Sequence, residues 1–117
     1  MINTISEYTD EGGKSPYAEW LHSLRDVRAK AKIIMQVDKM ELNLFADVKP
    51  IGEGLSELRI HYGPGYRVYY AKEARQVFLL LCGGDKSAQS KDIKRAKEYW
   101  KDHKRRNEHG AQCKSDT

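Results

Sequence analysis

The spacing of apolar residues in this sequence changes near Pro50, and that change limits the fold more than any other feature. Before Pro50 the apolar side chains recur every three or four residues, which is typical of helices that bury one face. After it they alternate with polar residues, which is typical of strands. A chain of 117 residues holds about one domain, so we expect both halves to share one core.

The first half predicts a short strand and two helices. Residues 2–8 favour an opening strand. Ser15 before Pro16 is typical of a helix start, because the hydroxyl accepts from a free N–H and proline needs no donor there. Asp26 is typical of the cap of a second helix that runs to about Phe45. A connection this short predicts an antiparallel helical hairpin.

The second half predicts three strands, at 55–61, 66–71 and 77–82, followed by a helix that begins at 87–90 and ends near His103. The third strand is apolar on both faces, which predicts a central position. Gly52-Glu53-Gly54 is expected to be a loop, and Gly83-Gly84 to end the third strand. The predicted fold is α+β in the order β-α-α-β-β-β-α, a small, mainly antiparallel sheet with its helices, among them the helical hairpin, on one face.

The chain ends in a polar segment. Residues 104–117 lack an apolar period, so they are predicted to be a disordered tail after a single domain over residues 1–103. Cys82 lies in the apolar strand and Cys113 in this tail, which indicates a core thiol and a tail thiol, not a disulfide.

Positive charge is concentrated near the end of the chain. The net charge is +4, but residues 86–106 hold nine basic and three acidic side chains and therefore carry +6. Such asymmetry is typical of a surface that meets polyphosphate, and a solvated basic helix is the alternative. The N-terminus lacks the basic and apolar regions of a secretory signal, and no apolar run could span a bilayer, so we expect a cytoplasmic protein without membrane contact.

Three cations are the best candidates for chemistry. The four histidines are far apart, and no Cys or His stands at ligand spacing, so neither a metal site nor another cofactor is expected. Arg59 and Arg67 belong to adjacent predicted strands joined by a tight turn, so both can point from one face. Lys86 follows the third strand at the rim of the sheet. Three cations at one rim would bind a phosphate and stabilise the charge that grows on it.

A histidine and a tyrosine are further candidates for a role in binding or cutting RNA. His61 is a candidate for proton transfer because histidine is the side-chain type that ordinarily gains or loses a proton near neutral pH, with an exposed strand histidine as the alternative. Tyr69 shares a face with Arg67 and could stack on an unpaired base. Tyr66 and Tyr70 share the opposite face with Val68 and are predicted to be core.

Three motifs carry a family resemblance. They read Gly54-Leu55-Ser56-Glu57-Leu58-Arg59, Gly65-Tyr66-Arg67-Val68-Tyr69-Tyr70 and Gly83-Gly84-Asp85-Lys86-Ser87. With residues 92–96 and the helical hairpin, they resemble the RelE/ParE superfamily of toxins over nearly everything from residue 2 to about 103. The resemblance is strongest to the HigB-type branch, also called phage Gp49-like or addiction-module killer proteins.

The resemblance implies a type II toxin that cuts mRNA in the ribosomal A site without a metal and so inhibits translation. By position, Arg67 matches the phosphate-stabilising arginine of the family, Lys86 its second cation, and Arg59 its basic strand position more loosely. Lys91, Lys94 and Arg95 of the basic last helix would dock onto ribosomal RNA. The tyrosine that the RelE pattern carries on its closing segment has no counterpart here, which leaves Asp92, His61 and Lys91 as unranked proton-transfer candidates.

The resemblance also implies partners and leaves two other functions open. A co-encoded antitoxin, often a helix-turn-helix protein, would neutralise the toxin, and operator DNA would be bound only through that complex. ParE members poison DNA gyrase without cutting RNA, so fold alone does not fix the target. A non-toxic member that acts as a binding partner or co-repressor is the third hypothesis.

Overall fold

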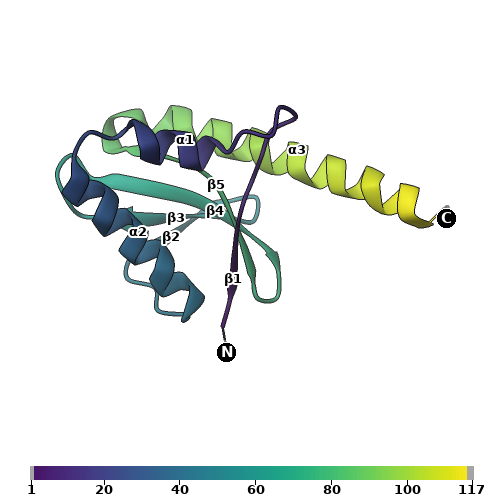
Figure 1. Cartoon of the computed structure of the whole chain (residues 1–117), viewed down its shortest axis with the longest axis horizontal. Helices are drawn as coiled ribbons and strands as arrows, with labels where there is room; N and C mark the ends of the chain where they lie inside the picture. The colour runs from purple at the N-terminus through teal and green to yellow at the C-terminus, as the bar shows by residue number, and fades with distance from the viewer. Residues whose placement is uncertain (1, 116–117) are drawn as a thin grey trace.

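Within the residues that the structure describes, 2–115, five strands form one sheet in the order β1-β5-β4-β3-β2, as the computed structural model in Figure 1 shows. Side chains are described for residues 2–108. The elements are β1 (Thr4–Glu7), α1 (Pro16–Ser23), α2 (Val27–Glu41), β2 (Val48–Gly52), β3 (Leu55–Ile60), β4 (Tyr66–Ala74), β5 (Val77–Asp85), the short 3₁₀ helix η1 (Lys86–Ala88) and α3 (Gln89–Ser115). The predicted α+β class is confirmed.

The apolar strand β5 lies inside the sheet, as its sequence predicts. It runs parallel to β1 on one side and antiparallel to β4 on the other. Leu79, Leu80 and Leu81 are all at most 2% exposed, because helices or loops cover both faces of the strand. The other two strand pairs, β4 with β3 and β3 with β2, are antiparallel.

Strand β2 was not predicted from the sequence. The chain forms a hairpin in which β2 pairs with β3, and only Glu53 and Gly54 form the turn between them. Both turn residues have positive φ angles, 57° and 82°, as a two-residue hairpin turn of type I′ requires. Gly52 therefore belongs to a strand and not to the expected loop. Pro50 is tolerated because β2 is an edge strand.

The predicted helix starts are confirmed. Ser15 accepts a hydrogen bond from the N–H of Ala18 at 3.1 Å, and Pro16 is the first residue of α1. Asp26 accepts from two N–H groups at the start of α2, at 3.0 and 3.2 Å. The second helix ends at Glu41, before the predicted end near Phe45, because Asn43 adopts a left-handed conformation with φ of 61°.

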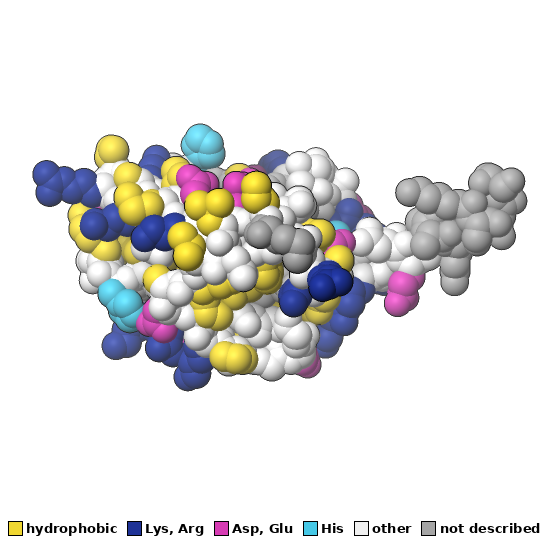
Figure 2. All heavy atoms as spheres, turned by 90° about the horizontal axis from the view of Figure 1, so that it is seen from below, with side chains coloured by type: hydrophobic (Ala, Val, Ile, Leu, Met, Phe, Trp, Pro, Cys, Tyr) yellow, Lys and Arg dark blue, Asp and Glu magenta, His cyan; other side chains and the backbone are white. Residues whose placement is uncertain are grey.

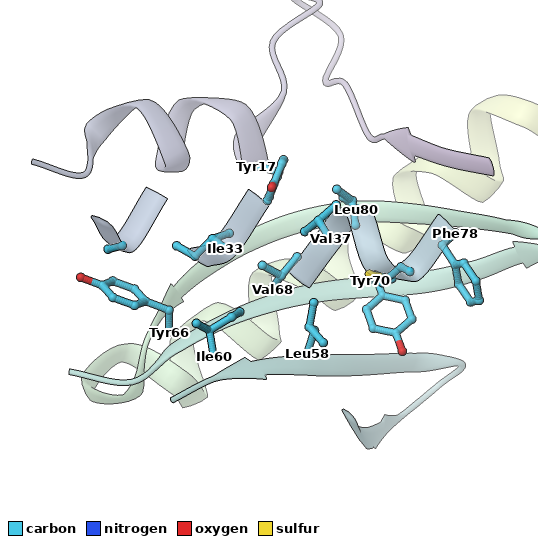
Figure 3. Packing of buried hydrophobic residues seen from close by; sticks show 12 residues of the cluster. Tyr17, Ile33, Val37, Leu58, Ile60, Tyr66, Val68, Tyr70, Phe78 and Leu80 are labelled. Atoms are coloured by element: carbon cyan, nitrogen blue, oxygen red, sulfur yellow. The ribbon is translucent and has the colours of Figure 1, made fainter. Parts of the chain in front are cut away.

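Helices cover both faces of the sheet, which corrects the prediction of helices on one face only. One core cluster joins α1 and α2 to the face that carries Leu58, Val68 and Leu80, as Figure 3 shows. The second cluster joins Ala96 and its neighbours in α3 to the face that carries Tyr69. The residues Arg59, Arg67 and Glu57 alternate with the first cluster and therefore lie on the α3 side.

The last helix is longer than the sequence predicts. It starts at Gln89, within the expected range, but continues past His103 to Ser115, and its C-terminal part projects beyond the sheet (Figure 1). Residues 104–115, expected in a polar tail, therefore continue this helix, and residues 116 and 117 lie outside the described residues. Cys82 is a buried free thiol, as expected, whereas the side chain of Cys113 is outside the described part.

Strand β5 extends through the two glycines that were expected to end it. Gly83 and Gly84 pair with Val68 and Arg67 of β4. A Cβ at Gly83 would stand 2.2 Å from the ring of Trp20, and one at Gly84 would stand 1.8 Å from Oδ2 of Asp92. The missing side chains therefore let α1 and α3 approach the end of this strand closely.

Large apolar side chains are exposed on α2 and on the segment that follows it. They include Ile34, Met35, Leu42, Leu44 and Phe45, which are 36 to 59% exposed. Figure 2, which views the molecule from below Figure 1, shows apolar side chains at the surface between Lys and Arg side chains. In the described part of the chain, no helix has the length and apolar character needed to cross a membrane.

Candidate active site

Two arginines and a lysine meet at one end of the sheet. Arg59 of β3 is the direct cross-strand partner of Arg67 in β4. Lys86 follows the last residue of β5, and its N–H donates to the carbonyl of Gly65 at 2.8 Å. That hydrogen bond fixes the start of η1 beside the turn between β3 and β4. The fold thus brings together three cations that are far apart in sequence.

These cations line one open cavity of about 450 Å³. Arg59, Arg67 and Lys86 contribute its charge, and the turn at 61–65 forms much of its wall, including the side chain of His61. No acidic residue belongs to the lining. A concave site with several donors and net positive charge is suited to a phosphate group.

The carboxylate of Glu57 contacts both arginines. Its carboxylate is completely buried, with Oε1 3.1 Å from Nε of Arg59 and Oε2 3.4 Å from Nε of Arg67. Gln89 donates to both oxygens, at 3.3 and 3.2 Å. A buried carboxylate is tolerated only when it is paired and hydrogen-bonded, which these contacts achieve.

The arginines keep donors for a ligand. Each meets Glu57 through Nε, and among residues 2–108 no hydrogen bond is found to the Nη atoms of these two arginines. The side chains are 27% exposed at Arg59 and 12% at Arg67. A guanidinium anchored at Nε and open at Nη is oriented before an anion arrives, so it can form a paired contact with little reorganisation.

The structure corrects the expected stacking role of Tyr69. Its side chain is completely buried under α3, so no base can reach the ring in this arrangement. Its hydroxyl has no hydrogen-bond partner among the described residues. Burial, with a smaller contribution from the negative charge of Glu57, raises the pKa of Tyr69 above its ordinary value.

His61 lies in the cavity and is paired with Asp47. Its Nε2 is 2.5 Å from Oδ2 of Asp47, and the imidazole side chain is 73% exposed. The hydrogen bond with His61 lowers the pKa of Asp47. The carbonyl of Asp47 accepts from the N–H of Arg59 at 2.8 Å, which fixes the carboxylate next to the cavity.

The remaining candidates lie on α3, outside the cavity. Asp92 is 7% exposed and lines a second groove, of about 320 Å³, between α1 and α3. Arg95 lines the same groove, while Lys91 and Lys94 are exposed on the helix surface. The geometry therefore groups His61 with the three cations and separates Asp92 from them.

The chain is similar to known proteins over most of its length. Residues 19–101, which include both arginines, Lys86 and roughly the first half of α3, match the family model described as phage-derived protein Gp49-like (DUF891). The chain belongs to the Gp49-like family. It is also 47% identical over 81 residues to an uncharacterized protein of Haemophilus influenzae, and this similarity covers 69% of the chain and 82% of the relative.

Three residues of this Gp49-like protein's site were missed by the sequence analysis: Glu57, Gln89 and Asp47. Glu57 has the spacing of an exposed strand residue, and only its position two residues before Arg59 hinted at a pair. Gln89 reaches Glu57 through a contact 32 residues apart in sequence, and Asp47 reaches His61 from 14 residues away. No local pattern encodes such contacts.

Proposed function

We propose that this Gp49-like protein is the toxin of a type II toxin–antitoxin system and that it cuts mRNA on the ribosome, in the cytoplasm, without a metal ion. The observation that carries the proposal is the single cavity lined by Arg59, Arg67 and Lys86. The Gp49-like family is associated with the toxins of toxin–antitoxin systems, which supports the toxin part of the proposal.

The proposed reaction is an internal transfer within RNA. The ribose 2′-oxygen attacks the neighbouring phosphorus and the bond to the 5′-oxygen breaks, which leaves a cyclic phosphate and a free 5′-hydroxyl. Negative charge grows on the phosphate oxygens during this step. The free Nη donors of Arg59 and Arg67 and the ammonium of Lys86 would stabilise that charge.

His61 is the proposed proton-transfer residue. The reaction removes a proton from the 2′-hydroxyl and supplies one to the leaving 5′-oxygen, so it needs a group that can do either near the phosphate. His61 lines the cavity, whereas Asp92 and Lys91 do not. Because Nε2 of His61 bonds to Asp47, Nδ1 is the nitrogen left for the substrate.

The basic surface of α3 is proposed to hold ribosomal RNA. Lys91, Lys94 and Arg95 are exposed there, in the segment of 86–106 with a net charge of +6. Contacts of this kind are made to phosphates and release counterions, so binding to ribosomes should weaken steeply as salt concentration rises.

A cognate antitoxin is the proposed protein partner. Exposed apolar side chains lie on α2, as Ile34 and Met35 do, and directly after it, as Leu42 does. Lysines such as Lys32 and Lys39 accompany them on the helix. Apolar patches with a charged margin are typical of protein interfaces. An antitoxin segment with apolar and acidic residues would fit this surface.

The test is to map mRNA 5′ ends in cells after brief induction of the protein. New ends within translated codons are expected for the wild type, and about 100-fold fewer for Lys86→Ala, since loss of one stabilising donor costs about two to three orders of magnitude in rate. Lys86 is exposed and forms no ion pair within residues 2–108, so this change leaves the fold intact. Lys72→Ala, at the far end of β4, is the matched control and should cut normally.

The outcomes separate the candidate functions. Equal cutting by Lys86→Ala and the wild type would contradict the role of the cavity. Unchanged 5′ ends together with DNA-damage signalling would favour gyrase inhibition instead. Absence of growth arrest, with operator binding by the antitoxin complex, would favour the non-toxic co-repressor.

A further inference from the structure

The side of α3 that faces away from the sheet carries a continuous row of lysines. The packed side is marked by Ala96 and Tyr99, which belong to the second core cluster or pack against it. On the other side, lysines recur every three or four residues, the spacing that keeps side chains on one face of a helix. They are Lys91, Lys94, Lys97, Lys101 and Lys104. At about 1.5 Å of rise per residue, the row is about 20 Å long.

The chain itself leaves the positive charge of this row without counter-charges. Four of the five lysines are exposed, and Lys97 is partly buried. None of the five forms an ion pair within residues 2–108. Glu98 is the only exposed acidic residue from 91 to 105, a stretch that the structure describes in full. Asp92 is buried there, and Asp102 accepts a hydrogen bond from Tyr8. The face is therefore suited to a polyanion.

Contacts with the rest of the fold hold this part of α3 in place. The hydroxyl of Tyr8, which directly follows β1, donates to Asp102 at 2.6 Å. Nε2 of His103 lies 2.6 Å from Oε1 of Glu73 in β4. Each contact stands next to a lysine of the row, so the charges have fixed positions. Such a row fits phosphates whose own positions are fixed, because neither partner then loses much conformational freedom on binding.

The aromatic rings of α3 already have partners within the chain. Tyr99 stacks on Tyr8 with ring centres 5.0 Å apart. Trp100 stacks on His103 at 5.9 Å, and the ammonium of Lys104 lies 5.1 Å from its ring centre. The helix has no other tyrosine, tryptophan or phenylalanine. Proteins that bind single strands rely on free aromatic rings on which unpaired bases stack, so this face favours a double helix instead.

We propose that the lysine row on the outer face of α3 binds the backbone of double-helical RNA. The inference rests on the proposed function, because it extends the RNA contacts proposed there for α3 and names the form of RNA that they fit. The wide, shallow minor groove of an RNA double helix presents 2′-hydroxyls beside the phosphates, and ammonium groups donate to both. The family match ends at residue 101, so it does not cover Lys104 at the end of the row.

The test is fluorescence anisotropy of the full chain with a labelled RNA hairpin at several salt concentrations. Five phosphate contacts predict that the logarithm of the affinity falls with the logarithm of salt concentration with a slope of about −4.5, which is roughly a 500-fold loss between about 50 and 200 mM. A single-stranded RNA of the same length should bind more weakly, because it gains no stacking on α3. A DNA duplex of the same sequence is the third probe.

Two double variants and one single variant make the result specific. Lys94→Ala with Lys101→Ala should weaken binding to the hairpin and reduce the slope by about two. Lys32→Ala with Lys72→Ala removes two exposed lysines outside α3 and should change neither quantity. Glu98→Lys should tighten binding and steepen the slope by about one, a gain that unfolding cannot produce. All five positions are exposed, so thermal denaturation should show folded proteins.

Several results would overturn the proposal. The first is binding of single-stranded RNA as tight as that of the hairpin, and the second is tighter binding of the DNA duplex than of the hairpin. The third is an unchanged salt slope in the protein that lacks Lys94 and Lys101. The fourth is displacement of the hairpin by polyglutamate at equal charge concentration, which would indicate an acidic protein as the partner of this face.

The lysine row and the nuclease can fail separately. Hairpin binding that depends on Lys94 and Lys101, without new mRNA 5′ ends after induction, would sustain the lysine row and refute the nuclease. New mRNA ends without such binding would do the reverse. Lys86→Ala, which changes the cavity and not the outer face of α3, should bind the hairpin as tightly as the wild type does.

Discussion

Arg59 and Arg67 face each other directly across β3 and β4, and the buried carboxylate of Glu57 contacts the Nε atom of each. Like charges opposite one another destabilise a strand pair, so the two guanidinium groups depend on Glu57 for their proximity. The same carboxylate leaves the Nη atoms directed elsewhere. One residue therefore both offsets the repulsion in the sheet and prepares the cations for an anion.

Replacing Glu57 by Gln should destabilise the fold strongly. The change leaves two paired arginines without the negative charge between them, and removal of one partner from a buried ion pair typically costs about 3 to 5 kcal/mol. Urea denaturation should show a lower free energy of unfolding by about 3 kcal/mol, because the arginines retain some contact with water.

The matched control is Glu53→Gln in the β2–β3 turn. Glu53 is exposed and forms no ion pair in the described part of the chain, so its replacement should change stability by less than about 0.5 kcal/mol. A Glu57→Gln protein as stable as this control would mean that the carboxylate does not compensate the arginines.

Much of the site's framework could be predicted from the sequence, because it depends on local patterns. The alternation of apolar and polar residues along both strands predicted that Arg59 and Arg67 lie on one face of the sheet. The tight turn at 61–65 predicted that the two strands are neighbours, and the structure pairs them. Lys86 follows directly after the apolar strand, so its position at the sheet end was also predictable. Each of these inferences uses residues close together in the chain.

The remaining features depend on contacts between distant segments. The α3 helix covers the face opposite α1 and α2, and its own apolar stripe gives no sign of which face it meets. Burial of Glu57 and Tyr69 follows from that placement, so both were expected on the accessible side. Strand β2 was missed because it is a short edge strand with Pro50 in its middle and only partly buried apolar residues.

Gly84→Ala should disturb the contact between β5 and α3. The new methyl group would stand 1.8 Å from Oδ2 of Asp92, so the helix or the strand must shift. Overpacking of this kind typically costs about 1 to 3 kcal/mol, which thermal denaturation would detect. Gly12→Ala is the control, since its nearest neighbour is the end of the Asp10 side chain at 3.3 Å, which has to move by only a few tenths of an ångström, so the loss should be smaller than for Gly84→Ala.

Asp26→Ala should weaken α2 and loosen one wall of the cavity. Asp26 accepts from the N–H groups of Arg28 and Ala29, and its other oxygen accepts from the hydroxyl of Tyr62, a cavity residue, at 3.1 Å. Loss of such a cap typically costs about 1 kcal/mol. Chemical denaturation would measure this loss.

Asp38→Ala is the control for the cap. Asp38 is exposed within the same helix and forms no ion pair in the part of the chain that the structure describes. Alanine favours helices, so this variant should be as stable as the wild type or slightly more stable. Equal losses for both variants would argue against a capping role for Asp26.

Asp102 should make stability depend on acid pH. The hydroxyl of Tyr8 donates to Asp102 at 2.6 Å, and this bond, together with Arg105, lowers the pKa of the carboxyl below its ordinary 3.8. Because the folded state binds this proton less readily than the unfolded state, the stabilisation is complete above the ordinary pKa and disappears as pH falls through the folded value.

Asp102→Asn should therefore lower the free energy of unfolding by about 1 kcal/mol at neutral pH and by progressively less toward about pH 2. Urea denaturation at several pH values measures this trend, with the exposed Glu98→Gln of the same helix as control. A deficit in Asp102→Asn that stayed constant with pH would mean that the hydrogen bond stabilises the fold without the charge.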